Sequence, residues 1–587
     1  MGKRSFVFAF IFYLLFLSLL GFLVSNHKFN KGKEVFQQEA TLWKVIGDQL
    51  INTNNMTVVF HSIALPNGVY NIVYPYQIFG SEYELKDEDY LKIVGLGMNS
   101  VRFYVQYSWL RDDDMFDFFQ YLDKQIALAK KHGVSIILNL HYFGEAGQVQ
   151  RGEEDGFYKG NKKYNLTEFW KKISDKYKHE EGIAAYDLIN EPSTSAKFTE
   201  KMLYAKYQEI VEMLRANGDR HILIISDPVN KFGNALKNEI KNVNPFIKLS
   251  DNNIMYQFHW YEPIEFTHQG FFDSEYFELG ADYPMEKRLD AYKGGYYRNP
   301  YISETKGQWV EYKTSWVDLD LSNCEINREE DKFNLSLSFS GLKGEVWFDD
   351  ISLYKKDVSE NIVRLPVPNY DVSNSRSFIG WTKNPAASKM PARWNAMNDP
   401  KTSGIECRID WESDHSGNGS GSLYANGAKA KWGKDNPWAT WGQSGGALST
   451  YYNIEKDVKY QVRFWVKTVN NPAYNVSVGF GIYNVKEILL NKFIMQNLIH
   501  EYYAKWAKKH KVPLFCGEFG TTNPGLLNSS YMSQQQADWV RDMKEILEKE
   551  VGSWSYHSYK SYSPRSDLFG LYNTKEDRQI IRVLRNK

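Results

Sequence analysis

The stretch FFQYLDKQIALAKKHGVSIILNLH, residues 118–141, contains the unit from which the fold is built. Its apolar residues first recur with the period of an amphipathic helix, over 118–131, and Gly133 ends that helix. A mostly apolar run follows at 135–141, which is typical of a strand that is buried on both faces. A helix that leads directly into a buried strand predicts a parallel α/β sheet.

The same alternation continues in both directions from this unit. A second helix is predicted over 201–216, ended by Gly218, and a third opens with Ser533 and Gln536 in capping-box spacing. Eight strand–helix units predict a closed (β/α)8 TIM barrel. The expected strands are 58–63, 100–105, 135–141, 184–190, 221–225, 254–260, 512–518 and 553–556.

Between the sixth and seventh strands the period of the sequence changes to two. Phe333, Leu335, Leu337 and Phe339 alternate with polar residues, and 458–467 alternates in the same way. This pattern predicts an all-β jelly-roll sandwich inserted in a loop at the carboxyl end of the barrel strands. The expected domains are barrel parts at 40–295 and 491–587, an insert at 300–490, and an N-terminal segment at 1–30.

That N-terminal segment reads as an export signal. Lys3 and Arg4 precede an apolar run from Phe6 to Val24, and every face of this run is apolar. A removed signal peptide and a retained membrane anchor both remain open, because the run is long and no small-residue cleavage pattern closes it. In either case we expect the protein outside the cytoplasm, as an extracellular or cell-surface protein.

Composition narrows the classes of partner. The 71 basic and 71 acidic residues cancel, which argues against a nucleic-acid-binding protein. An aromatic content of 16% suits surfaces that stack on the C–H faces of sugars. The three cysteines cannot form a disulfide scaffold and have no metal-ligand spacing, so no metal or other cofactor is expected.

Polar residues at the carboxyl ends of barrel strands are the candidates for catalysis. Two glutamates, Glu191 after strand four and Glu518 at the end of strand seven, are expected to face each other across the barrel mouth. Paired carboxylates, one protonated and one ionised, are what cleavage of a glycosidic bond requires. The other candidates are Arg102, His141, Asn190, His259 and Tyr261.

Five motifs in chain order resemble glycoside hydrolase family 5, the cellulase-like group. They are VRF (101–103), LNLH (138–141), LINEP (188–192), FHWYEP (258–263) and GEFG (517–520). The resemblance covers about 55–290 and 490–587, and the ordered set is more specific than any one motif. It implies a retaining hydrolase of β-linked glucans, cellulose-like or other, with a polysaccharide or oligosaccharide as substrate.

Carried over position by position, the resemblance implies that Glu191 is the general acid/base and Glu518 the nucleophile, with carboxyl groups about 5–5.5 Å apart. Asn190 is then expected to hold the sugar 2-hydroxyl, and Tyr261 to hydrogen-bond the nucleophile. Arg102 is expected to keep Glu518 ionised. His141 and His259 are expected to shape the subsite around the cleaved bond.

The stretch WSYHSYK, residues 554–560, departs from the family, which usually carries a tryptophan platform where this chain has His557. Trp554 comes three residues earlier and is expected on the opposite side of the strand. We take His557 and Trp554 as candidate substrate-binding residues. The departure leaves the identity of the sugar open.

Within the insert, VWFDDISL (346–353) resembles the closing strand of jelly-roll carbohydrate-binding modules, and 416–420 with 460–467 resembles their earlier half. Because the closing half comes first, one circularly permuted module and two incomplete modules are both open. Trp465 lies on the polar side of its strand, as a sugar platform or as ordinary packing.

The leading interpretation is an exported retaining β-glucan hydrolase. A β-mannanase or a transglycosylase on the same fold is an alternative within the enzymes. A non-catalytic surface glycan-binding protein is the alternative from another class, because a fold does not guarantee activity. The oligomeric state is not set by the sequence.

Overall fold

The computed structural model describes most of the chain from residue 42 onward, and the predicted export segment lies outside the described residues. No helix among these residues has both the length and the apolar character needed to cross a bilayer. The described ranges are 42–69, 73–110, 115–142, 165–194, 198–229, 231–232, 244–270, 279–298, 301–340, 342–378, 386–398, 405–429, 438–443, 450–471, 473–522, 530–560, 569–572 and 578–585.

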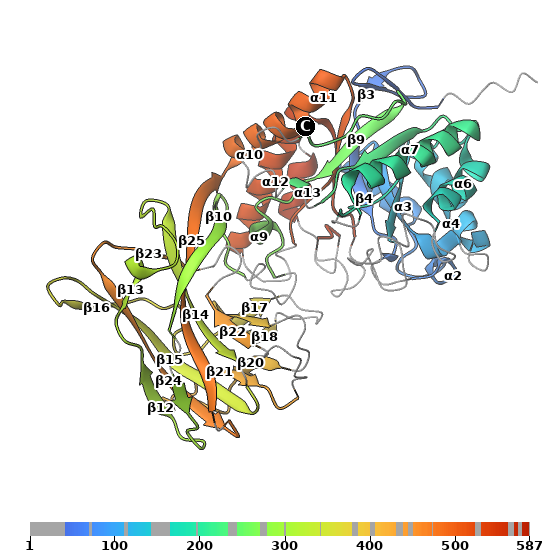
Figure 1. The fold of residues 1–587 in the computed structure, drawn as a ribbon. Helices are drawn as coiled ribbons and strands as arrows, with labels where there is room; N and C mark the ends of the chain where they lie inside the picture. Colours follow the sequence, from blue (N-terminus) through green and yellow to red (C-terminus); the bar gives the residue numbers. More distant parts are fainter. Residues whose placement is uncertain are drawn as a thin grey trace, which may run out of the picture.

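Eight parallel strands close into a barrel, which confirms the predicted fold (Figure 1). The strand order around the barrel is the order along the chain, and the last strand pairs with the first. The strands are β4 (His61–Leu65), β5 (Ser100–Gln106), β6 (Ser135–Tyr142), β7 (Ile183–Asp187), β8 (Ile222–Ser226), β9 (Ile254–His259), β26 (Leu514–Phe519) and β27 (Gly552–Tyr556).

Helices follow the strands around the outside of the barrel. They are α2 (Pro75–Ile78), α3 (Asp87–Gly95), α4 (Met115–Lys131), α6 (Leu166–Tyr177), α7 (Glu200–Ala216), α9 (Ile264–Thr267), α10 (Lys492–Ile499), α11 (Lys505–His510), α12 (Ser530–Glu550) and α13 (Arg578–Arg585). A π-helical turn, His500–Ala504, joins α10 to α11. A short 3₁₀ turn, Tyr107–Leu110, follows β5.

The start of α12 corrects one sequence-based prediction. The helix begins at Ser530, so Ser533 is already helical and does not cap it. Gln536 is buried and donates its side-chain amide to the carbonyl of Thr522 at 2.7 Å. The capping-box spacing is therefore coincidental, because Gln536 fixes the loop after β26 instead of the helix end.

A small sheet closes the amino end of the barrel. It consists of β1 (Lys44–Ile46), β2 (Gln49–Ile51) and β3 (Thr57–Val58). Trp43 beside this sheet packs on Phe60, with ring centroids 5.2 Å apart, and joins an apolar layer inside the barrel. This layer fills the amino half of the barrel interior, so the polar interior residues gather at the carboxyl end of the strands.

The insert is a β-sandwich with two sheets. One sheet contains β10 (Met285–Arg298), β25 (Ala473–Leu490), β14 (Asp331–Ser340), β22 (Trp438–Gly442) and β19 (Asn395–Asn398), with β11 (Tyr301–Ser303) and β23 (Tyr452–Asn453). The other contains β12 (Val310–Lys313), β24 (Lys459–Val469), β15 (Glu345–Lys356), β21 (Ser422–Asn426) and β20 (Glu406–Asp410), with β13 (Val317–Asp318) and β16 (Ile362–Leu365). A hairpin of β17 (Ser375–Phe378) and β18 (Ala386–Pro391) lies beside them.

One apolar core unites the two sequence halves of the sandwich. Phe333 and Phe348 from the first half lie in the same core as Phe464 and Phe480 from the second. The open alternative of two incomplete modules is therefore wrong, since the halves complete a single domain. One ring face of Trp465 is covered, because His415 stacks on it with centroids 3.7 Å apart.

The two long strands β10 and β25 join the sandwich to the barrel. They pair antiparallel from Met285 opposite Leu490 to Arg298 opposite Val478, and this ribbon runs from the barrel into the sandwich (Figure 1). The insert thus begins at Met285, ahead of the expected residue 300. No residue of β10 from Glu286 to Lys293 is buried, so this part of the sequence lacks the alternation that marks a strand with one buried face.

The two glycines of the motif Gly517–Gly520 leave no room for a Cβ atom, and this close packing gives a prediction about stability. A Cβ at Gly520 would lie 2.2 Å from the carbonyl oxygen of His557, while a Cβ at Gly95 in α3 would meet no atom within 4 Å. Gly520→Ala should lower the free energy of unfolding by about 1–3 kcal/mol through overpacking. Gly95→Ala should be neutral or stabilising by up to about 1 kcal/mol. Thermal unfolding followed by circular dichroism measures both, and equal melting temperatures would contradict the packing argument.

Candidate active site

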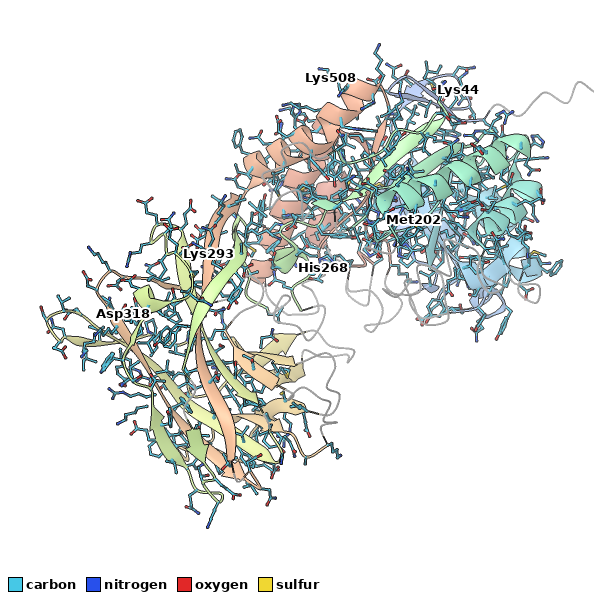
Figure 2. The ribbon with its side chains drawn as sticks, viewed as in Figure 1. Lys44, Met202, His268, Lys293, Asp318 and Lys508 are labelled. Atoms are coloured by element: carbon cyan, nitrogen blue, oxygen red, sulfur yellow. The ribbon has the colours of Figure 1, made fainter. Side chains whose placement is uncertain are left out.

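The site lies at the carboxyl end of the barrel, on the side that faces the sandwich. Figure 2 shows His268 at this end, with Lys44 and Lys508 at the opposite end. The structure brings together eight of the nine residues proposed from sequence, from β5, β6, β9 and β26 and from the turns after β7 and β27.

Arg102 on β5 is the centre of the group and is fully buried. Its guanidinium donates to Asp187 Oδ2 at 2.8 Å, to Glu518 Oε1 at 2.5 Å and to Asn190 Oδ1 at 2.9 Å. Burial works to lower the pKa of Arg102, but the Asp187 carboxylate and its neighbours hold that pKa well above its usual range. One cation therefore orients side chains from three other parts of the barrel.

Glu518 is enclosed by donors on both carboxyl oxygens. Oε1 accepts from Arg102 and from the Tyr104 hydroxyl at 2.9 Å, and Oε2 accepts from the Tyr261 hydroxyl at 2.8 Å. Burial would raise the pKa of Glu518, but His259 and the other surrounding positive groups hold it well below its usual range. The carboxyl group is consequently a carboxylate across the neutral pH range.

Glu191 stands in a different environment. Its side chain is 26% exposed, its backbone has a φ of 43°, and its Oε1 lies 2.9 Å from His259 Nδ1. One oxygen of Glu191, one oxygen of Glu518 and a ring nitrogen of His259 all lie within 4.8 Å of one another. The two glutamates therefore face the same small space, as the sequence predicted.

His259 lies between the two glutamates. Burial alone would lower its pKa, but Glu518 and the hydrogen bond to Glu191 raise that pKa above its usual value. The three ligand atoms could surround a cation. Arg102 already compensates the charge of Glu518, however, and Nδ1 of His259 is already bonded to Glu191, so the side chains fit a charge-balanced proton-transfer site better.

Two further imidazoles contact Tyr104, the residue whose hydroxyl donates to Glu518. His141 stacks on Tyr104 with centroids 3.7 Å apart, and its Nδ1 lies 2.9 Å from Asn139 Oδ1. Burial lowers the pKa of His141 well below its usual value, so this ring is neutral. Nδ1 of His557 lies 2.9 Å from the Tyr104 hydroxyl.

Trp554 is the one candidate that the structure removes from the site. It is 1% exposed within β27, stacks on His61 with centroids 4.7 Å apart, and meets Phe519 edge-on at 5.6 Å. It lies three residues before His557, and successive strand side chains alternate between faces, so it points into packing outside the site. The prediction that Trp554 contacts substrate is therefore corrected.

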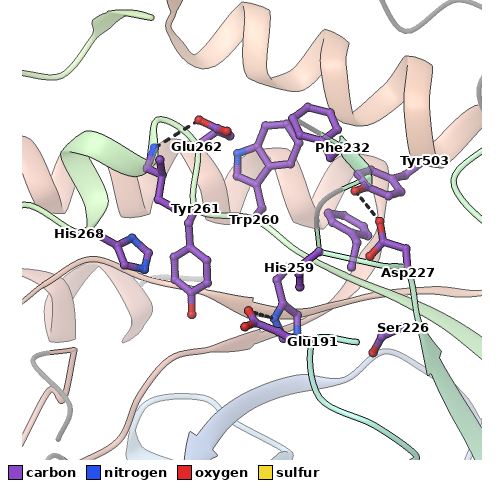
Figure 3. A pocket seen from close by; sticks show the side chains of 13 residues that line it. Glu191, Ser226, Asp227, Phe232, His259, Trp260, Tyr261, Glu262, His268 and Tyr503 are labelled. Atoms are coloured by element: carbon purple, nitrogen blue, oxygen red, sulfur yellow. Dashed lines mark hydrogen bonds and ion pairs between the residues drawn. The ribbon is translucent and has the colours of Figure 1, made fainter. Parts of the chain in front are cut away.

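A pocket of about 330 Å³ opens beside Glu191 (Figure 3). In Figure 3, Tyr261 and His268 lie on one side of the Glu191–His259 pair, and Asp227 and Tyr503 lie on the other. The lining residues are Glu191, Ser226, Asp227, Val229, Phe232, Phe258, His259, Trp260, Tyr261, Glu262, Ile264, His268 and Tyr503.

Sequence reasoning missed several members of the site. Tyr104 and Asp187 lie inside strands among apolar residues, where a polar side chain gives no visible motif. Asp187 stands three residues before the predicted Asn190, and it accepts from Arg102 and from the Gln257 amide at 3.1 Å. A charged residue in a fully buried strand was the available signal for Asp187.

His268 yields a prediction about acid stability. Burial lowers its pKa to about 3, whereas an unfolded histidine binds a proton near pH 6.5. The stability that the neutral ring contributes is thus fully present above pH 6.5 and is lost progressively as the pH falls toward 3. His268→Phe should therefore flatten the fall in unfolding free energy between pH 6.5 and 4 by up to about 1.4 kcal/mol per pH unit. Denaturant titrations at several pH values measure this slope, and an unchanged slope would show that the folded protein protonates His268.

Comparison with known proteins agrees with this geometry. The model of the cellulase family, glycosyl hydrolase family 5, matches residues 67–316. The match contains β5 to β9 and therefore Arg102, Glu191 and His259. Glu518 lies beyond it, because the sandwich separates the last two barrel strands from the first six.

Three curated relatives are similar to part of the chain. Cellodextrinase A of Ruminococcus flavefaciens is 27% identical over 191 residues, which is 32% of this chain and 54% of that protein. Endoglucanase C of Acetivibrio thermocellus is 25% identical over 204 residues, 33% of this chain and 56% of that protein. Mannan endo-1,4-beta-mannosidase 5 of Solanum lycopersicum is 30% identical over 149 residues, 22% of this chain and 36% of that protein. The chain thus spans about half the length of the first two relatives. Residues 67–316 are thus similar to the cellulase family, glycosyl hydrolase family 5, and the closed barrel accords with that similarity.

Proposed function

We propose that the protein hydrolyses β-linked glucans by a retaining double displacement, with Glu518 as nucleophile and Glu191 as acid/base. The observation that carries this proposal is the approach of the two carboxyl oxygens to within 4.8 Å. Retaining glycosidases have carboxyl groups about 5–5.5 Å apart, while inverting enzymes need about 6.5–9.5 Å to admit a water molecule between carboxylate and sugar.

The first displacement forms a bond between Glu518 and the anomeric carbon. The glycosidic C–O bond breaks as Glu191 gives its proton to the leaving oxygen. In the second displacement a water molecule attacks the same carbon, Glu191 takes the water's proton, and Glu518 leaves as a carboxylate. Each residue ends in the protonation state in which it began.

The neighbours of the two glutamates fit these roles. Arg102, Tyr104 and Tyr261 hold Glu518 ionised and fix the direction of its oxygens. Asn190 accepts from Arg102 through Oδ1, so its amide nitrogen is turned away from Arg102 and suits the sugar 2-hydroxyl. His259 can take part in the proton balance of Glu191 through the 2.9 Å contact.

The names of the relatives support β-glucan as the substrate, since two of the three are a cellodextrinase and an endoglucanase. The mannan-cleaving relative makes β-mannan the second substrate to test. An exported location suits a polysaccharide substrate, because such polymers do not cross membranes. We therefore extend the proposal to action outside the cytoplasm on a polysaccharide or its oligosaccharides.

The stereochemical outcome tests the mechanism. The protein should release sugar from β-1,4-glucan or mixed-linkage β-glucan, and the first product should be the β-anomer. Proton NMR during the first minutes of the reaction, before mutarotation, distinguishes the anomers. A first product with the α configuration would overturn the retaining mechanism, and release from β-mannan alone would move the substrate to mannan.

Variants of the two glutamates should differ in their substrate dependence. Glu518→Gln should lower kcat by roughly 10³-fold or more on every substrate, because it removes the nucleophile. Glu191→Gln should lower kcat/KM strongly on glucans but much less on aryl glycosides whose leaving group needs no proton, because kcat/KM reports the first displacement.

Glu548→Gln, on the outer helix α12, is the matched control and should keep wild-type rates. Melting temperatures exclude unfolding as the cause of any loss. Near-normal activity of Glu518→Gln, or equal losses for Glu191→Gln on both substrate types, would contradict the assigned roles.

A further inference from the structure

The pocket beside Glu191 contains a third carboxyl group that the double displacement does not use. Asp227 follows β8, is 7% exposed, and lines this pocket together with Glu191 and His259. Its Oδ2 accepts a hydrogen bond from the Tyr503 hydroxyl at 3.0 Å. Among the described residues, the Tyr503 hydroxyl is the one side-chain donor to Asp227.

Tyr503 fixes the position of this carboxyl group. It belongs to the π-helical turn between α10 and α11, and its ring stacks on Phe258 of β9 with centroids 3.9 Å apart. Because this ring is buried and packed, Asp227 cannot rotate freely and keeps one oxygen toward Tyr503. The other oxygen is left for a group in the pocket.

Asp227 forms no direct ion pair among the described residues, although Lys231 and His259 act on it from a distance. Burial raises its pKa to about 7, against the smaller lowering effects of Tyr503 and His259. A carboxyl group that takes up and releases a proton near neutral pH can both accept from and donate to a hydroxyl group. A sugar hydroxyl can also both donate and accept, so it can hydrogen-bond the carboxyl group whether that group is protonated or ionised.

The position of the pocket indicates which sugar would enter it. Glu191 lines the pocket, whereas Glu518, Arg102 and His557 do not. The proton donor sits beside the oxygen of the leaving group, and the nucleophile sits beneath the sugar that it attacks. The space on the Asp227 side of Glu191, away from Glu518, therefore receives the leaving part of the substrate.

Apolar aromatic side chains also line this pocket. Phe232 and Trp260 pack together with centroids 4.8 Å apart, and both line the pocket near Asp227 and Tyr503 (Figure 3). The indole Nε1 of Trp260 is buried without a hydrogen-bond partner. A pocket with both aromatic and polar side chains in its lining suits a pyranose, which has apolar faces and hydroxyl groups at its rim.

We propose that Asp227, held by Tyr503, binds a hydroxyl group of the sugar that departs from the cleaved bond, and so selects substrates with a sugar in that position. This inference rests on the proposed function. Asp227 is then a specificity residue for oligosaccharide and polysaccharide leaving groups, and it takes no part in attack or proton transfer.

The test compares two substrates with the same attacked sugars and different leaving groups. One is a cello-oligosaccharide, whose leaving group is a sugar, and the other is an aryl cellobioside, whose leaving group has no sugar hydroxyls. Asp227→Leu, which keeps the approximate volume, should lower kcat/KM on the oligosaccharide by roughly 10- to 100-fold. On the aryl cellobioside it should change kcat/KM by less than about threefold.

Two tyrosine variants provide controls on the same helical turn. Tyr503→Phe removes the hydroxyl that fixes Asp227 and should give a smaller selective loss on the oligosaccharide. Tyr502→Phe removes a neighbouring hydroxyl that does not line the pocket and should leave both rates unchanged. Melting temperatures of all variants are compared with the wild type.

The outcomes separate the inference from the function on which it rests. If the wild-type protein cleaves neither substrate, the proposed function fails. If the wild type cleaves both and Asp227→Leu affects them equally, or affects neither, the role of Asp227 in selecting the leaving sugar is overturned. A partial loss in Asp227→Asn, which keeps polar atoms, would support recognition of a hydroxyl group.

Discussion

The buried guanidinium of Arg102 is the constraint on which the rest of the site depends. It lies inside the barrel with the carboxylates of Asp187 and Glu518 and the amide oxygen of Asn190 at hydrogen-bond distance. Removing a single partner from such a group leaves an uncompensated buried charge, which costs several kcal/mol, about 3–5. The network is therefore satisfied only when β5, β7 and β26 stand in one closed barrel, so closure of the fold and assembly of the site are the same event.

Because the site needs a closed barrel, the insert must begin and end close together, so that β26 can pair with β9. β26 supplies Glu518, yet the whole sandwich separates it in sequence from β9, its neighbour in the barrel. The β10–β25 ribbon achieves this, because Leu490 at its end pairs with Met285 at its start. Ion pairs fix the base of the ribbon, since Lys287 contacts Glu262 at 2.6 Å and Lys492 contacts Asp542 at 3.6 Å. A domain whose ends are adjacent can be inserted without opening the barrel.

The sequence was most informative where burial imposes a simple pattern. All eight barrel strands were predictable, because continuous apolar runs bounded by helices have few other interpretations. Polar residues at strand ends were predictable for the same reason, since they interrupt that pattern. Asp187 and Tyr104 were not, because their partners come from strands that are distant in sequence. The start of the β10–β25 ribbon was missed, since no residue from Glu286 to Lys293 is buried and the sequence there shows no alternation. Trp554 was included because it neighbours His557 in sequence, although it points the opposite way.

Three carboxyl groups in one cleft take different parts because their neighbours differ. Glu518 has a cation and two hydroxyl donors, which outweigh the cost of burial and keep it charged. Asp227 has one hydroxyl donor and no direct ion pair among the described residues, so burial outweighs the weaker effects of Lys231 and His259 and raises its pKa. Glu191 has the His259 imidazole beside it and an exposed quarter of its side chain. The three residues share the carboxyl group, so the difference between Glu518 and Asp227 follows from the groups around each carboxyl rather than from the carboxyl itself.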